Sequence, residues 1–170
     1  MRRLLASVAL IAIVLPLTAP AAQAVKPDRF TPGLAPDLVI EGVCEFDVLI
    51  HDVVNQIVIT THFDQEGNVV REQGSGRIVE QITRLDDQGE PVRSITRNIS
   101  GPGTFTFDED GATLVARGPW MFFFFPGEIV GDPDGLIWLT TGRWVWRIED
   151  EGITLVSHTG RFQDVCALLA

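Results

Sequence analysis

Acidic, glycine-containing segments interrupt this chain at regular intervals, and the runs between them are rich in Val, Ile, Thr, Phe and Trp. The segments are residues 64–68, 86–90, 108–111, 132–135 and 149–152. An aspartate starts a tight turn by binding its own backbone, and a glycine accepts the positive φ that closes the turn. The runs between these turns show no helical periodicity. The pattern predicts an all-β fold built as an antiparallel meander.

A second glycine recurs at one phase of this meander, and an aromatic residue follows it two positions later. The repeated elements are 118–120 (Gly-Pro-Trp), 142–144 (Gly-Arg-Trp) and 160–162 (Gly-Arg-Phe). A glycine inside a strand marks a bulge or a sharp bend, and repeated bends curl a sheet into a barrel. We therefore expect a small β-barrel of about eight strands, and the alternative is a two-sheet β-sandwich.

The first residues have the three parts of a secretory signal peptide. Arg2 and Arg3 precede an apolar run over residues 4–17, and residues 22–24 (Ala-Gln-Ala) fit the small-x-small pattern of a cleavage site. The apolar run is shorter than the ~20 residues that a helix needs to cross a bilayer. We therefore expect residues 1–24 to be removed and the mature chain to be secreted, or to reach another oxidising compartment, without a membrane span.

The remainder of the chain has the size of one domain. Residues 25–37 contain three prolines and a glycine, which predicts an extended leader. Residues 38–170 then form the single β-barrel domain. The formal net charge of the whole chain is −10. This acidity favours solubility and disfavours nucleic acid as a partner, and no motif indicates a cofactor.

The chain has two cysteines, Cys44 near the start of the expected domain and Cys166 near its end. In an oxidising compartment such a pair predicts a disulfide. A nucleophilic cysteine or a metal thiolate would need a neighbouring histidine or further cysteines, and the local sequence has neither. The bridge would join the first and last strands, which must meet in a closed barrel.

Residues 120–126 (Trp-Met-Phe-Phe-Phe-Phe-Pro) form the most unusual run in the chain. Because a strand points alternate side chains to opposite faces, both faces of this strand are apolar. A tight turn at residues 132–135 would place Phe122 opposite Trp144. The expected aromatic wall consists of Trp120, Phe122, Phe124, Trp138, Trp144 and Trp146. Such a wall is either packed core or the lining of a ligand site.

The opposite face of the same strand carries Met121, Phe123 and Phe125. In the assumed register these side chains lie beside Arg143, Val145 and Arg147. A bare apolar face promotes aggregation. We therefore expect a subunit interface of a homo-oligomer or a covering segment over this face.

The polar side chains form no recognisable active site. His51, His62 and His158 lack metal-ligand spacing, and no metal site is expected. Ser157, His158 and Asp164 are the one local grouping of hydroxyl, base and acid. Adjacent residues of a strand point to opposite faces, so Ser157 and His158 are not expected to bond to each other. We assign no catalytic residue.

Arginines and glutamates are concentrated in the middle strands of the expected meander. They are Arg71, Arg77, Arg84, Arg93, Arg97, Glu72, Glu80 and Glu90. Two interpretations stay open. The side chains either point inward and make a polar, charge-paired lumen suited to a carboxylate or another polar ligand, or they form a solvated face with weak cross-strand ion pairs.

The glycine-bent meander with Gly-x-Trp elements at 118–120 and 142–144 resembles the calycin and lipocalin architecture. It is also similar to the barrels of allene oxide cyclases and dirigent-type proteins, and in style to small secreted proteins of GC-rich bacteria. The likeness covers residues 38–166 as a pattern. It implies a barrel whose interior holds a small ligand, and it carries over no catalytic residue.

These observations favour a non-catalytic extracellular protein that binds a small apolar or aromatic molecule, or a protein partner, through the aromatic wall. A barrel enzyme of the cyclase or isomerase type is the first alternative, and it requires an Arg, Glu or His beside that wall. A structural or oligomerising envelope protein is the second alternative.

Overall fold

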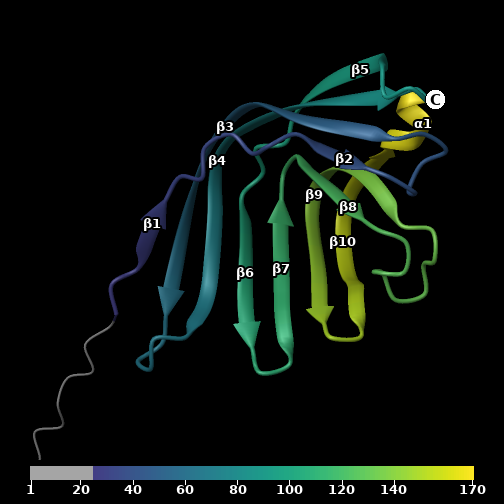
Figure 1. The fold of residues 1–170 in the computed structure, drawn as a ribbon. Coiled ribbons are helices and arrows are strands. Elements are labelled where there is room, and N and C mark those ends of the chain that lie inside the picture. The colour runs from purple at the N-terminus through teal and green to yellow at the C-terminus, as the bar shows by residue number, and fades with distance from the viewer. Residues whose placement is uncertain (1–24) are drawn as a thin grey trace, which may run out of the picture.

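The computed structural model describes residues 25–170, so the expected signal peptide, residues 1–24, lies outside the described part of the chain. The described residues form ten antiparallel strands and one short helix (Figure 1). The elements are β1 (Asp28–Phe30), β2 (Leu38–Ile40), β3 (Val48–Phe63), β4 (Val69–Leu85), β5 (Pro91–Asn98), β6 (Gly103–Asp108), β7 (Gly111–Arg117), β8 (Trp120–Phe124), β9 (Leu136–Glu149), β10 (Gly152–Asp164) and α1 (Val165–Leu169). The prediction of an all-β antiparallel fold is confirmed. No helix within residues 25–170 is long and apolar enough to cross a membrane.

The expected acidic turns all lie between strands. Asp86 shows how they form, because its Oδ1 accepts hydrogen bonds from the backbone N–H groups of Gln88 at 2.8 Å and Glu90 at 2.9 Å. These bonds hold the pKa of the Asp86 carboxyl below its usual value. Gly89 then adopts a φ of 79°, a conformation that a residue with a Cβ rarely adopts.

Two long hairpins, β3–β4 and β9–β10, change partners along their length. Residues 71–74 of β4 pair with β6, whereas residues 79–85 pair with β5. In the same way, residues 136–140 of β9 pair with β8, and residues 143–148 pair with β7. Each hairpin therefore begins in one part of the sheet and ends in another.

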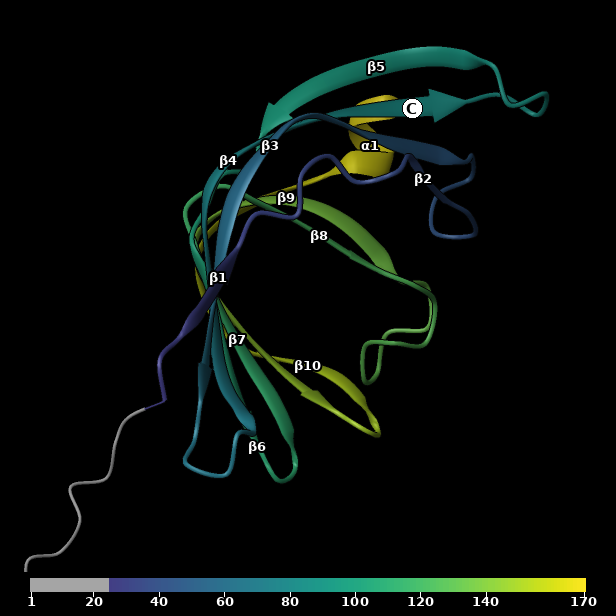
Figure 2. The same cartoon turned by 60° about the vertical axis from the view of Figure 1, so that its left-hand side comes forward.

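The hairpins bend where their partners change, and the sheet folds onto itself in layers, which Figure 2 shows nearly edge-on. The upper arm comprises β2, β5, residues 48–52 of β3 and residues 79–85 of β4. The middle arm comprises β8, residues 136–140 of β9 and residues 160–164 of β10. The lower sheet comprises β1, β6, β7 and the remaining parts of the four long strands.

Glycines make the bend of the β9–β10 hairpin possible. Gly142 and Gly160 face each other across the two strands, with φ values of 93° and 143°. A Cβ on Gly142 would collide with the backbone of Thr159, and one on Gly160 with the backbone of Thr141. The expected bends therefore occur at these two glycines. Gly118 instead lies in the connection between β7 and β8.

The layers enclose two distinct cores. Between the middle arm and the lower sheet lies the aromatic layer, whose buried members are Leu114, Ala116, Phe122, Leu136, Trp144 and Trp146. Between the upper and middle arms lies the aliphatic layer, whose buried members are Ile40, Val48, Ile50, Ile82, Ile99, Ile137, Leu139, Val165 and Leu169. β8 thus packs side chains against a core on each of its faces, which explains why this strand is apolar throughout.

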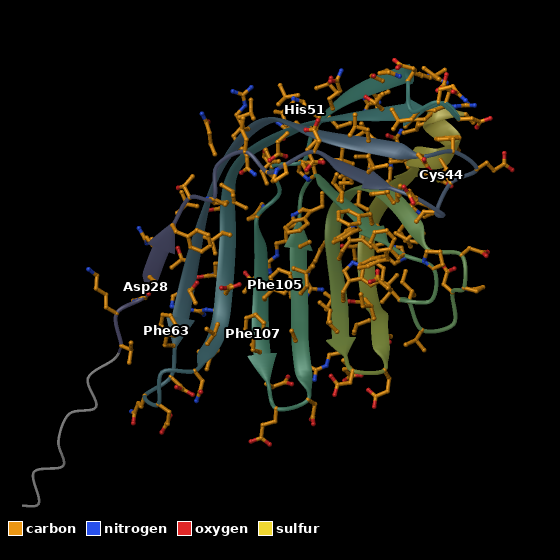
Figure 3. All side chains as sticks on the ribbon, in the orientation of Figure 1. Asp28, Cys44, His51, Phe63, Phe105 and Phe107 are labelled. Carbon is orange, nitrogen blue, oxygen red and sulfur yellow. A yellow bond between two sulfur atoms is a disulfide. The ribbon has the colours of Figure 1, made fainter. Side chains whose placement is uncertain are left out.

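The predicted disulfide between Cys44 and Cys166 is present. Its placement differs from the expectation, because Cys44 lies in the segment between β2 and β3 and Cys166 lies in α1, not on the first and last strands (Figure 3). The bridge ties α1 to the upper arm at the edge of the aliphatic layer. The sheet itself is not closed by hydrogen bonds, since β1 and β10 are the two ends of its strand order.

Candidate functional site

The register between β8 and β9 differs from the one assumed for the aromatic wall. Phe122 lies opposite Trp138 and not opposite Trp144, and Trp120 lies opposite Thr140. The cause is the connection between the strands, which is longer than a tight turn. It folds back so that the Val130 N–H donates to the Ile153 carbonyl at 2.9 Å.

The six rings of the expected wall nevertheless come together in the aromatic layer. Trp144 and Trp146 belong to the lower sheet through their pairing with β7. The bend at Gly142 turns the middle arm over them, so that the Phe122 ring lies 6.2 Å from Trp144 and 5.5 Å from Trp146 between centroids. The bend, and not the strand register, builds the cluster.

Most of this wall is tightly packed. Trp144 and Trp146 are each 1% exposed, and Phe122 is 4% exposed. The Trp144 indole N–H donates to the Thr141 carbonyl at 3.0 Å. At the margin of the layer, Phe105 stacks with Phe107 along β6 (6.3 Å between centroids), and Figure 3 shows the two side by side. The inner rings therefore have the environment of a protein core.

The other face of β8 is covered within the chain. Met121 lies opposite Leu139 and Phe123 opposite Ile137, so the expected neighbours Arg143, Val145 and Arg147 are not beside them. Both side chains pack against the aliphatic layer. This face was expected to form a subunit interface or to lie under a covering segment, and the upper arm is such a segment. Phe125 is 38% exposed beyond the end of β8.

A cleft of about 480 Å³ opens between the two arms, and we call it the arm cleft. It is lined by Arg97, Asn98, Ile99, Pro119, Trp120, Leu139, Thr140, Thr141, Arg161, Phe162 and Gln163. These residues come from the end of β5 in the upper arm, and from the start of β8, the bend of β9 and the adjoining part of β10. The cleft thus lies where the aliphatic layer meets the bend.

Trp120 links the aromatic wall to the arm cleft. Its ring stacks on Phe122 at 5.6 Å between centroids, and it also lines the cleft. The indole lies on the backbone of Gly101 and Gly103, where a Cβ would collide with it. Its Nε1 is buried and has no hydrogen-bond partner among the described residues. Trp120 is therefore the member of the predicted wall that borders this open space.

The two arginines of the arm cleft come from different arms, Arg97 from β5 and Arg161 from β10. Within residues 25–170, neither guanidinium has a carboxylate oxygen within 4.0 Å. Arg147, by contrast, pairs with Asp108 at 2.6 Å and with Glu149 at 2.9 Å. Unpaired guanidinium groups are the natural partners of planar anions.

A charged row borders the cleft on the upper arm, where Asp52, Glu80 and Arg97 face one another across β3, β4 and β5. Burial, and secondarily the negative charge of Asp52, raises the pKa of Glu80 to about 7. The Glu80 Oε2 is buried without a hydrogen-bond partner in the described structure. Glu80 is therefore partly buried, whereas Arg71, Arg77 and Arg93 are exposed, so the charge-paired lumen stays a prediction.

The histidines serve local contacts. His51 Nδ1 lies 2.6 Å from Asp37 Oδ1, and the His158 ring stacks on Trp144 at 4.5 Å between centroids. Ser157 and His158 pair with successive residues of β9, so they point to opposite faces of β10. In residues 25–170 no three His, Cys, Asp or Glu side chains are grouped as metal ligands.

Sequence reasoning singled out Trp120 and Arg97 but missed Arg161, Gln163 and Ile99. The sequence signal for Arg161 was present, because this residue follows the bend glycine Gly160, but nothing indicated that β10 would fold under β5. Trp138, another member of the wall, borders a second cleft of about 400 Å³ beside the disulfide. No protein-family model, curated protein or solved structure matches this chain, so the site rests on its own geometry.

Proposed function

We propose that this protein is a non-catalytic extracellular binding protein that holds a small apolar or aromatic molecule in the arm cleft. The observation that carries the proposal is the cleft itself. Its volume of about 480 Å³ lies within the range of small-molecule sites, about 300 to 1,000 Å³. Its walls combine Trp120, Leu139 and Phe162 with a few polar groups, which is the usual composition of such a site.

The disulfide supports the extracellular part of the proposal, because such bridges persist in oxidising compartments. Because the aromatic layer is tightly packed, the proposed site does not include most of the predicted wall. Trp144 and Trp146 are fully covered, so they support the site from behind, while Trp120 contacts the ligand. A ligand role for the full set of six rings stays a prediction.

A fluorescent apolar probe tests the proposal. N-phenyl-1-naphthylamine is neutral, and its emission rises when it leaves water for an apolar site. We expect the purified protein to bind it saturably. Thr141 lines the cleft and is exposed, so Thr141→Trp fills the cleft without disturbing the core. This variant is expected to weaken binding by about tenfold or more.

The matched control is Thr154→Trp, an equal change at an exposed threonine of β10 in the lower sheet. It should leave probe affinity unchanged. The proposal is wrong if the protein does not bind the probe, or if both variants change its affinity equally. Unchanged thermal unfolding of Thr141→Trp shows that any loss of binding is local.

A further inference from the structure

We infer that the arm cleft selects ligands with an apolar or aromatic body and an anionic headgroup, such as a carboxylate or sulfonate, which Arg97 and Arg161 bind together. This inference rests on the proposed function and names the class of ligand. It goes beyond the apolar walls, because it assigns a charge to one end of the ligand and two residues that recognise it.

Two arginine residues from different arms line the cleft. Arg97 comes from the upper arm and Arg161 from the middle arm, and both line the same cleft. A planar anion accepts hydrogen bonds from more than one guanidinium, and charge-assisted bonds of this kind are about twice as strong as neutral ones. The cleft therefore offers two strong donors to one end of a ligand.

Carboxylates are abundant in this chain, so an unpaired arginine is notable. It has 23 acidic and 13 basic residues, so a structural arginine has many potential partners. Arg147 uses two of them. Other arginines on the upper arm are occupied by the C-terminal helix, since Arg84 and Arg93 donate to the carbonyls of Leu169 at 3.4 Å and Ala170 at 2.9 Å. Among residues 25–170, Arg97 donates only to the adjacent Thr96 carbonyl.

The acidic residue paired with Arg97 in the sheet is Glu80. Glu80 lies directly opposite Arg97, yet its Oε2 forms no hydrogen bond in the described structure. Burial raises the pKa of Glu80 to about 7, so near neutral pH a large fraction of this side chain carries no charge. Arg97 thus keeps a positive charge that the protein does not neutralise.

The remaining walls fit the rest of such a ligand. Ile99 and Leu139 belong to the aliphatic layer, and Trp120 adds an aromatic side chain to the lining. Asn98, Thr141 and Gln163 add neutral donors and acceptors around the arginines. The geometry is that of an amphipathic site, with an apolar floor and a cationic rim.

A pair of probes that differ by one charged group tests the inference. 1-Anilinonaphthalene-8-sulfonate has the ring system of N-phenyl-1-naphthylamine and adds a sulfonate. We expect the protein to bind the sulfonate more tightly. Arg97→Gln and Arg161→Gln should each weaken sulfonate binding by about tenfold and leave binding of the neutral probe within about twofold. The control Arg143→Gln removes an equal charge from an exposed residue outside the cleft, and it should change neither affinity.

The outcomes separate this inference from the proposed function. If neither probe binds, the proposed function fails. If the neutral probe binds and Thr141→Trp blocks it, but the arginine variants bind the sulfonate normally, the function stands and the headgroup assignment is overturned. If Arg143→Gln weakens sulfonate binding as much as the cleft variants do, general charge explains the effect and the assignment is again overturned. Because Arg161 is exposed, Arg161→Gln decides the question even where Arg97→Gln impairs folding.

Discussion

The aromatic and aliphatic layers lie on opposite faces of the same middle arm, and they differ in composition and closure. The aromatic layer buries Trp144, Trp146 and Phe122 in mutual ring contacts. The aliphatic layer packs branched side chains, and the charged row that includes Glu80 borders it. Both clefts described above open at the aliphatic layer.

The two layers differ in how completely their margins are covered. Large rings fill the space above the lower sheet and cover the indole groups of Trp144 and Trp146, whereas both clefts open beside the smaller aliphatic side chains of the second layer. The disulfide and the short helix line one of the two clefts. Both layers are packed cores, and under the proposed function the aliphatic layer also borders the ligand site.

The largest expected effect tests whether the aliphatic layer depends on its crosslink. The bridge joins residues 122 positions apart, and the chain-entropy model gives roughly 5 kcal/mol for a loop of that length. Replacing both Cys44 and Cys166 by Ala should lower the free energy of unfolding by an amount of this order, measured by urea denaturation. A loss below about 1 kcal/mol would show that the aliphatic layer holds the upper arm without help, and the contrast between the layers would fail.

The next effect tests the aromatic layer as structural core. Trp146 is 1% exposed and contacts Phe122 and Phe124, so Trp146→Ala should cost about 3 to 5 kcal/mol of unfolding free energy. Phe162→Ala is the matched aromatic deletion at a 50% exposed position, and about 1 kcal/mol or less is expected. Equal losses in thermal or urea unfolding would contradict the assignment of the inner rings to the core.

Local rules predicted much of this fold. The aspartate–glycine turns follow from side-chain hydrogen bonds and positive φ, and each lies between strands in the structure. The disulfide and the bends at Gly142 and Gly160 were also accessible, because cysteine pairing and missing Cβ atoms depend on few residues.

Long-range arrangement was not accessible in the same way. The β8–β9 register depends on how residues 125–135 fold back to Ile153, which no turn motif specifies. The arm cleft requires that Arg97 and Arg161, from two different arms, line the same space. That arrangement is a property of layer packing, so the candidate site was predictable only through Trp120 and Arg97.

The smallest expected effect tests whether the carboxyl group of Glu80 is buried beside the aliphatic layer. In the folded protein the pKa of Glu80 is about 7, against an ordinary value of 4.5. Between these pH values the folded state binds more protons than the unfolded state, so stability falls as pH rises and then levels off above about pH 7. The loss is on the order of 3 kcal/mol.

Glu80→Gln removes the charge that burial disfavours, so the variant should match the wild type near pH 4 and exceed it above about pH 7 by an amount of that order. The measurement is urea denaturation over this pH range. Glu66→Gln, in the exposed turn between β3 and β4, is the control and should run parallel to the wild type. If the Glu80→Gln profile is also parallel, the carboxylate is solvated in the folded state. Glu80 would then contribute no buried charge beside the aliphatic layer, and this part of the contrast with the aromatic layer would fail.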